Sequence, residues 1–156
     1  MVVKAHARID NMNKGPLIAE SERFGTHFAS YATATCDGIL TLLAIGVSPN
    51  DERTVSALSW LQDHEGFGWP AGIPAADPTG WGGAMYYYHM AVRAEAYAAL
   101  GVAGEWTEHL TSILSKEQHP DGHFLNPSGS LNKEDDPLIA TTLALEALLS
   151  AATPAG

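Results

Sequence analysis

Apolar and polar residues along the chain recur at the spacing of amphipathic and buried helices, and no segment shows a convincing strand pattern. The predicted helices cover residues 31–45, 51–63, 84–100, 105–118 and 137–151. Residues typical of helix boundaries mark their ends, because Gly46 and Gly101 follow two of them and Asp136-Pro137 precedes the last. The sequence therefore predicts an all-α protein with about five main helices.

Two kinds of helix alternate along the chain. The segments 51–63 and 105–118 are apolar on one side, whereas 31–45, 84–100 and 137–151 are apolar nearly all round. A helix without a polar face must be covered on all sides. The order is therefore predicted to be inner, outer, inner, outer, inner. Residues 1–28 are polar and weakly periodic, and are predicted to be an arm or linker with one short helix at 17–23, ahead of a repeat domain at 29–152.

The loops after the second and fourth helices repeat a pattern. Gln62 and Gln118 lie 56 positions apart, and each is followed four residues later by a glycine and then by an aromatic residue, Phe67 or Phe124. Repeats of this length stack because a single helix pair cannot bury its apolar face alone. We expect the glutamine, glycine and aromatic residues to connect neighbouring repeats, with the glutamine amide bonded to carbonyl groups that the last helical turn leaves unpaired.

These residues resemble the helical repeats of the terpenoid-cyclase and protein-prenyltransferase superfamily. The segment Leu114–Phe124 is similar to the glutamine–aspartate–glycine–aromatic repeat of squalene–hopene cyclases, and Trp60–Trp69 is a looser copy. Three further segments are similar to uncharacterised bacterial prenyltransferase and squalene oxidase repeat proteins: Met85–His89, Leu125–Pro127 and Asp136–Thr141. The resemblance covers about residues 30–150 and implies a partial α/α toroid of alternating inner and outer helices.

The resemblance also implies a function. A domain of this kind would bind a hydrophobic, isoprenoid-type ligand in an aromatic-lined cleft, with or without catalysis. The alternative is a non-catalytic repeat domain used for structure or protein interaction. The residues expected to line the cleft are Trp69, Trp81, Tyr86, Tyr87, Tyr88 and His89, and Tyr97 belongs to the same aromatic set. Aromatic faces attract cations and pack against prenyl chains, although the same rings could simply fill the space between helices.

Candidates for acid catalysis lie just before the last helix. Cyclases of the superfamily that protonate an alkene use an Asp-x-Asp-Asp motif, and the nearest segment here is Lys133–Asp136. Asp135 and Asp136 are the candidate acids, but a lysine occupies the position of the first aspartate. Asp136 before Pro137 is also a typical N-cap.

Metal-ligating residues are scattered. The zinc-binding set of protein prenyltransferases has an aspartate, a cysteine and a histidine, for which Asp37, Cys36 and His89 are the candidates. Adjacent residues point about 100° apart on a helix, so Cys36 and Asp37 would hardly face one metal. A second group, His119, Asp121 and His123, is equally consistent with surface histidines. We therefore predict no metal and no cofactor.

Charge and apolar surface limit the partners. The formal net charge of −10 excludes a nucleic-acid-binding surface. No apolar run is long enough to span a membrane and no signal segment is present, which by default predicts a soluble, cytoplasmic chain. The segment 137–151 has Glu146 as its only charge, so something outside the repeat domain must cover it. The expected partners are a hydrophobic small molecule and either a second copy of the chain or further repeats of a longer chain.

Overall fold

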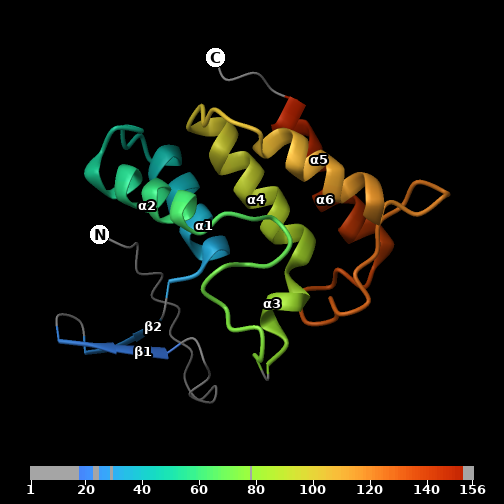
Figure 1. Cartoon of the computed structure of the whole chain (residues 1–156), viewed down its shortest axis with the longest axis horizontal. Helices are drawn as coiled ribbons and strands as arrows, with labels where there is room; N and C mark the ends of the chain where they lie inside the picture. Colours follow the sequence, from blue (N-terminus) through green and yellow to red (C-terminus); the bar gives the residue numbers. More distant parts are fainter. Residues whose placement is uncertain (1–17, 23–24, 29, 78, 153–156) are drawn as a thin grey trace.

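The computed structural model describes residues 18–22, 25–28, 30–77 and 79–152. In chain order the elements are β1 (Ile18–Ser21), β2 (Gly25–Phe28), α1 (Ala32–Ala44), α2 (Glu52–Asp63), α3 (Trp81–Ala84), α4 (Tyr86–Ala99), α5 (Trp106–Glu117) and α6 (Pro137–Ala152) (Figure 1). The all-α class is confirmed, with a short hairpin ahead of the helices. The predicted helix at 17–23 is wrong, because β1 pairs antiparallel with β2 and places Ile18 opposite Phe28. Threonine, phenylalanine and isoleucine favour a pleated surface over a helix.

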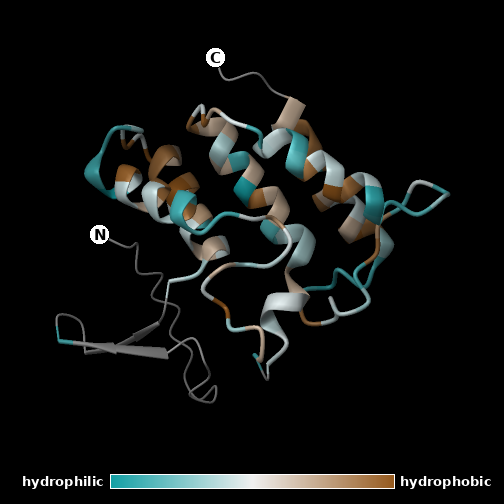
Figure 2. Cartoon of the chain, viewed as in Figure 1, coloured by the Kyte–Doolittle hydropathy of each residue, from teal (hydrophilic) through white to brown (hydrophobic). Residues whose placement is uncertain are grey.

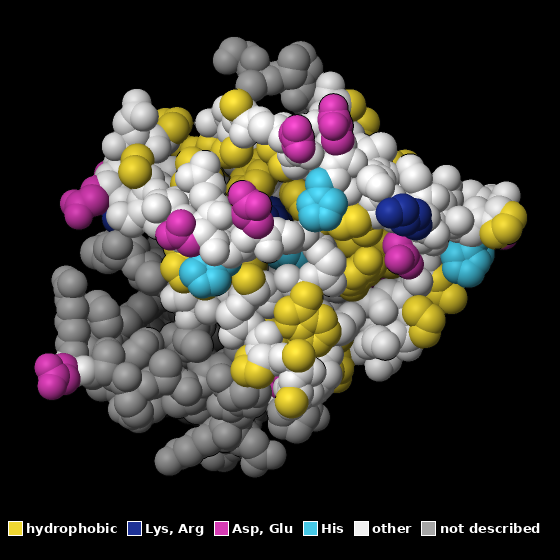
Figure 3. Space-filling view, in the orientation of Figure 1, with side chains coloured by type: hydrophobic (Ala, Val, Ile, Leu, Met, Phe, Trp, Pro, Cys, Tyr) yellow, Lys and Arg dark blue, Asp and Glu magenta, His cyan; other side chains and the backbone are white. Residues whose placement is uncertain are grey.

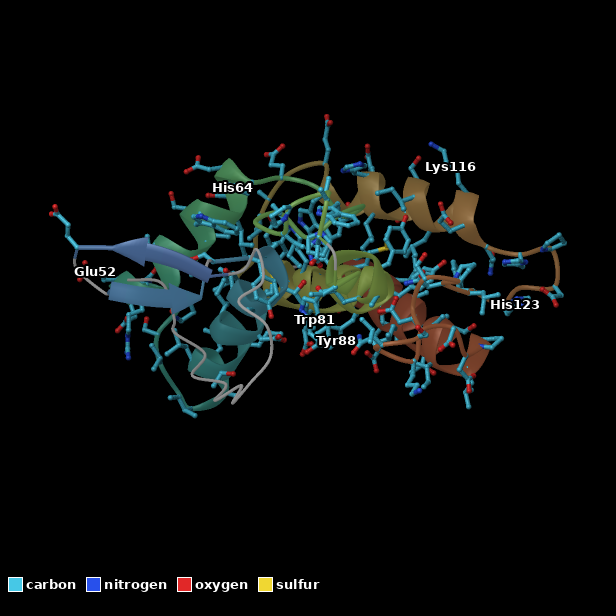
Figure 4. All side chains as sticks on the ribbon, turned by 90° about the horizontal axis from the view of Figure 1, so that it is seen from below. Glu52, His64, Trp81, Tyr88, Lys116 and His123 are labelled. Carbon is cyan, nitrogen blue, oxygen red and sulfur yellow. The ribbon has the colours of Figure 1, made fainter. Side chains whose placement is uncertain are left out.

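Three helices form a layer with α4 in the middle. α1 packs on one side of α4 and α6 on the other, while α2 packs on α1 and α5 packs on α6. Viewed edge-on, α2 and α5 lie on the same side of this layer (Figure 4). This arrangement has the predicted order of inner and outer helices. Whether the arc belongs to a larger toroid stays a prediction.

The core is centred on α4. Nine of its 14 residues are buried, which matches the prediction of a helix covered on all sides. α6 differs, because its buried residues are all alanines, Ala140, Ala144 and Ala147. Leu138, Leu145 and Leu149 are 75%, 51% and 67% exposed, although α6 is among the most apolar segments of the chain (Figure 2). The expectation that α6 is covered all round is therefore not met within a single chain.

The repeated loop pattern forms two similar turns. Gly66 and Gly122 have φ of 125° and 95°, which side chains rarely adopt, so the glycines are required there. Phe67 and Phe124 follow these turns and are both 2% exposed. The Gln118 amide donates to the carbonyl of Gly122 at 3.0 Å, closing the turn, rather than to a carbonyl of the last helical turn.

The predicted helix at 84–100 is in fact divided at Met85, whose backbone leaves the helical conformation at φ −113° and ψ 34°. Carboxylates stabilise the start of both pieces. Asp77 accepts the backbone N–H of Trp81 at 2.8 Å, at the start of α3. Glu134, far along the chain, accepts the backbone N–H groups of Tyr87 and Tyr88 at the start of α4. The first N–H groups of a helix have no partner within the helix, and these side chains supply one.

Candidate functional site

A cavity of about 540 Å³ opens on the side of the molecule that carries α2 and α5. Its lining comes from the loop after α2, from α4 and from the start of α5: Glu65, Gly66, Phe67, Arg93, Tyr97, Glu105, Trp106, Glu108 and His109. We call it the Arg93 cavity. Figure 3 shows acidic and histidine side chains gathered on this face of the molecule. Three segments that are distant in the sequence therefore build one site, because α2 and α5 lie on the same side of the layer that contains α4 (Figure 4).

Arg93 lies at the base of the cavity and is 1% exposed. Its Nη2 donates to the carbonyl oxygens of Leu61 at 2.8 Å and His64 at 3.0 Å, where α2 ends. It also donates to the Tyr97 hydroxyl at 2.8 Å, one helical turn along α4. The last carbonyls of a helix have no partner within the helix, so Arg93 stabilises the end of α2.

The guanidinium group of Arg93 is also enclosed by rings. Its central carbon lies 5.6 Å from the centroid of Phe67 and 5.2 Å from that of Tyr97. These distances are within the range of cation–π attraction. The Nε and Nη1 atoms are buried and have no hydrogen-bond partner among the residues that the structure describes. Arg93 thus has donor capacity that the described residues do not use.

Three aromatic side chains form the walls of the cavity. Phe67 stacks on Trp106 with ring centroids 6.2 Å apart, and Tyr97 meets Trp106 edge-on at 5.6 Å. Trp106 is fixed because its Nε1 donates to the carbonyl of Val102 at 2.9 Å. Phe67 and Tyr97 are 2% and 5% exposed and Trp106 is half-buried, so Trp106 is the ring that the cavity presents most fully to a ligand.

The exposed rim of the cavity is acidic. Glu65, Glu105 and Glu108 are exposed carboxylates, and His109 lies among them. A ligand with several negative charges would be repelled at the entrance before it reached Arg93. The site combines an acidic rim, aromatic walls and a single buried cation.

The residues predicted to line a cleft lie elsewhere. None of Trp69, Trp81, Tyr86, Tyr87, Tyr88 and His89 lines the Arg93 cavity, whereas Tyr97 of the same aromatic set does. Trp81 and Tyr88 lie on the opposite side of α4 from His64 and Lys116 (Figure 4). Trp69 donates from Nε1 to the carbonyl of Ile73 at 2.8 Å. Tyr87 and Phe124 pack edge to face with centroids 5.7 Å apart.

Tyr88 is joined to Asp37 on α1. The Tyr88 hydroxyl donates to Asp37 Oδ1 at 2.9 Å. Burial raises the pKa of the Asp37 carboxyl above its ordinary value, and the hydrogen bond from Tyr88 offsets part of that rise. Burial also raises the pKa of Tyr88, with the nearby Asp37 charge as a further cause. The pair holds a proton more firmly than either group does in water.

Neither candidate acid lies in a buried site. Asp135 and Asp136 are exposed. Asp136 Oδ1 accepts the backbone N–H of Leu138 at 2.8 Å, as the alternative N-cap interpretation predicts. The buried carboxylate of this loop is their neighbour Glu134, at 0% exposure. It accepts from Asn126 at 2.8 Å as well as from the start of α4, which makes it a structural residue.

The candidate metal ligands are not brought together. Among the described residues no group of three histidine, cysteine, aspartate or glutamate side chains could hold a metal ion. Burial raises the pKa of Cys36 to about 12, so it is a thiol rather than a ligating thiolate. Burial, with the charge of Arg93, lowers the pKa of His89 to about 4. The His119 and His123 rings stack at 4.3 Å, and His123 bonds Asp121 at 2.7 Å on the exposed turn.

Sequence reasoning missed Arg93 and Glu134, the two fully buried charged side chains among the described residues. A signal for Arg93 was present, because it is the only Lys or Arg in a largely apolar helical segment, whose one other charged residue is Glu95. Glu134 has no such signal, since a glutamate in a polar loop is ordinarily solvated. In the described part of the chain no helix is long and apolar enough to cross a membrane.

Comparisons with known proteins do not assign a function to these residues. Neither protein-family models, nor curated proteins, nor solved structures give a match to this chain.

Proposed function

We propose that this chain is a helical repeat domain that binds an apolar small molecule of isoprenoid type in the Arg93 cavity. The observation that carries the proposal is the aromatic wall made by Phe67, Tyr97 and Trp106 around a space of about 540 Å³. Small-molecule sites are concave and about 300–1,000 Å³ in volume, and this cavity has that volume and three aromatic lining residues beside its charged ones. The likeness of the repeat sequences to those of terpenoid cyclases and prenyltransferases selects isoprenoids as the first probes.

The proposed role of the cavity is binding. The Asp37–Tyr88 pair lies beyond its lining, and so do Asp135 and Asp136. The proposal is therefore a binding domain, in which ring faces contact an apolar chain and exclude water from it. The repeat loops serve this role by fixing Phe67 directly after the turn at Gly66.

The proposal is tested by calorimetric titration with farnesol of the wild-type chain and two matched tryptophan variants. Trp106→Ala removes a cavity wall, whereas Trp60→Ala removes a half-buried ring that stacks on His64 outside the cavity. We expect Trp106→Ala to weaken binding about tenfold, in line with the loss of one aromatic contact surface, and Trp60→Ala to leave it unchanged. Equal binding by all three proteins, or none by the wild type, contradicts the proposal.

A second candidate function is association with another copy of the chain. The observation that favours it is the apolar side of α6, where Leu138 and Leu145 are 75% and 51% exposed. Residues seven positions apart share one side of a helix, so these leucines belong to one exposed and largely apolar face of α6, which also includes Thr142. Such a face marks an association surface. We expect light scattering at micromolar concentration to give the mass of a dimer, and Leu145→Gln to give a monomer. A wild-type monomer rejects this candidate.

A further inference from the structure

Arg93 has more hydrogen-bond donors than the part of the chain described by the structure satisfies. A guanidinium group carries five N–H bonds in a fixed planar arrangement. The contacts of Arg93 with Leu61, His64 and Tyr97 all involve Nη2. The single N–H of Nε and the two of Nη1 have no partner among the described residues, and both atoms are buried.

Unpaired donors on a buried cation favour an acceptor from outside the protein. Buried charged groups are ordinarily paired or fully hydrogen-bonded, because leaving them unpaired is costly. Arg93 lines the cavity and is 1% exposed, so an acceptor that reaches it must arrive through the cavity. An anionic acceptor compensates the charge as well as the N–H groups, and charge-assisted hydrogen bonds are roughly twice as strong as neutral ones.

The acidic rim restricts that anion. Glu65, Glu105 and Glu108 surround the entrance, so every additional negative charge on a ligand adds repulsion near the surface. A diphosphate carries several charges and a carboxylate carries one. The walls between rim and base are Phe67, Tyr97 and Trp106, which match an apolar body.

We propose that Arg93 binds the carboxylate of an apolar, singly charged acid whose body lies between the cavity rings. This inference rests on the proposed function, since it assumes that an apolar ligand enters the Arg93 cavity. It adds that the ligand carries a carboxylate and that Arg93 binds this carboxylate. The ligand carboxylate accepts from Arg93 Nε or Nη1, while Nη2 keeps its contacts with the end of α2 and with Tyr97.

The first test compares three ligands with the same apolar body on the wild-type chain at pH 7. Farnesoic acid, farnesol and farnesyl diphosphate carry a carboxylate, a neutral hydroxyl and a multiply charged group. We expect farnesoic acid to bind about tenfold to a hundredfold more tightly than farnesol, the range of a hydrogen bond to a charged group. We expect farnesyl diphosphate to bind more weakly than farnesoic acid. Equal binding of the acid and the alcohol, or tightest binding of the diphosphate, overturns the inference but leaves the proposed function standing. Binding of none of them overturns the proposed function.

The second test uses Arg93→Lys. A lysine ammonium has three N–H groups, and the carbonyls of Leu61 and His64 and the Tyr97 hydroxyl are three acceptors. We expect the variant to keep the positive charge and, where its ammonium bonds these three acceptors, to have no donor left for a ligand. We expect the preference for farnesoic acid over farnesol to fall at least about fivefold. An unchanged preference in a folded variant overturns the inference.

Two measurements do not depend on the folding of an Arg93 variant. In Glu105→Gln/Glu108→Gln, we expect the affinity for farnesyl diphosphate to rise more than that for farnesoic acid, because rim repulsion is reduced. The charge of Arg93 contributes to the lowered pKa of His89, about 4 in the free protein. A bound carboxylate offsets that charge, so the pKa of His89 measured by NMR rises with farnesoic acid and not with farnesol. The same small change with both ligands counts against the inference.

Discussion

Glu134 and Arg93 are 0% and 1% exposed, and their hydrogen bonds give them different roles. Burying a charge is costly unless hydrogen bonds compensate it. Glu134 uses both carboxylate oxygens, with Oε2 accepting from Tyr87 and Asn126 and Oε1 from Tyr88. Arg93 uses one nitrogen and leaves two without a partner among the described residues. At the scale of single residues, one buried charge is a fully paired structural group and the other has unused capacity.

Glu134→Gln tests the structural role. The amide keeps one acceptor oxygen but turns an NH₂ group towards N–H donors of the protein, which leaves buried donors unpaired. We expect the free energy of unfolding to fall by about 3 kcal/mol. Urea denaturation measures the change. Asp135→Asn is the matched control, because the neighbouring carboxylate is exposed, and it should change stability by less than about 0.5 kcal/mol. Equal effects of the two substitutions would show that Glu134 does not stabilise the start of α4.

His89 predicts a dependence of stability on pH. Burial is the main cause that lowers its pKa from 6.5 to about 4, so the unfolded chain binds more protons between these values. Stability therefore rises with pH through this window and is lost as the pH falls from 6.5 to 4, by about 3 kcal/mol for this group. The measurement compares urea denaturation of wild type and His89→Gln at pH 7 and pH 4.5. The wild type should lose more stability than the variant, and His64→Gln on the surface should behave as wild type does. Parallel losses in wild type and His89→Gln contradict the assignment.

At the scale of elements, the sequence predicted what local pattern determines. Apolar periodicity predicted where the helices lie, and the glycines Gly46 and Gly101 predicted where two of them end. The structure shows both glycines with positive φ, 83° and 62°. The division at Met85 was not predictable from local pattern, because Glu134, which accepts N–H groups at the start of α4, is 47 positions from Tyr87. The Arg93 cavity was missed for the same reason, since Phe67, Arg93 and Trp106 meet only through packing. The aromatic pattern predicted that rings would line a cleft, but not which ones face a space and which fill the core.

The N-cap of α6 gives a prediction at this scale. Asp136 Oδ1 accepts the N–H of Leu138 at 2.8 Å. Asp136→Ala removes this acceptor and should lower the free energy of unfolding by about 1 kcal/mol. Asp136→Asn keeps an acceptor oxygen and removes the acid, so it should stay close to wild type in stability. Thermal denaturation of both variants measures the difference. Loss of stability in Asp136→Asn equal to that in Asp136→Ala would show that the carboxylate charge, rather than the cap, is what matters at this position.

The whole molecule is a layer of three helices whose two edges differ. α1 and α6 are each covered on one side by an outer helix, α2 and α5 respectively, but α6 packs alanines against its neighbours and leaves leucines exposed. Small residues let two helices approach closely, and the larger side chains of α6, its leucines, then lie mainly on the side that faces away from α4. The acidic surface opposes contact between copies, because each chain carries a formal charge of −10. Association through α6 therefore sets apolar burial against electrostatic repulsion.

This balance makes the association of two copies depend on salt concentration. Glu146 is the only charged residue of α6, and the helix carries no Lys or Arg. Two copies that meet through α6 are therefore not expected to form ion pairs between their α6 helices. Repulsion between the acidic surfaces is screened over about 10 Å at 0.1 M salt, while apolar burial is little affected. Association should therefore strengthen when sodium chloride is raised from about 20 mM to about 300 mM. Sedimentation velocity at fixed micromolar protein concentration measures the dimer fraction, and Leu138→Gln/Leu145→Gln serves as the variant without the apolar face. A dimer that weakens with salt would indicate an interface held by ion pairs elsewhere on the surface, and the leucines of α6 would then have no part in it.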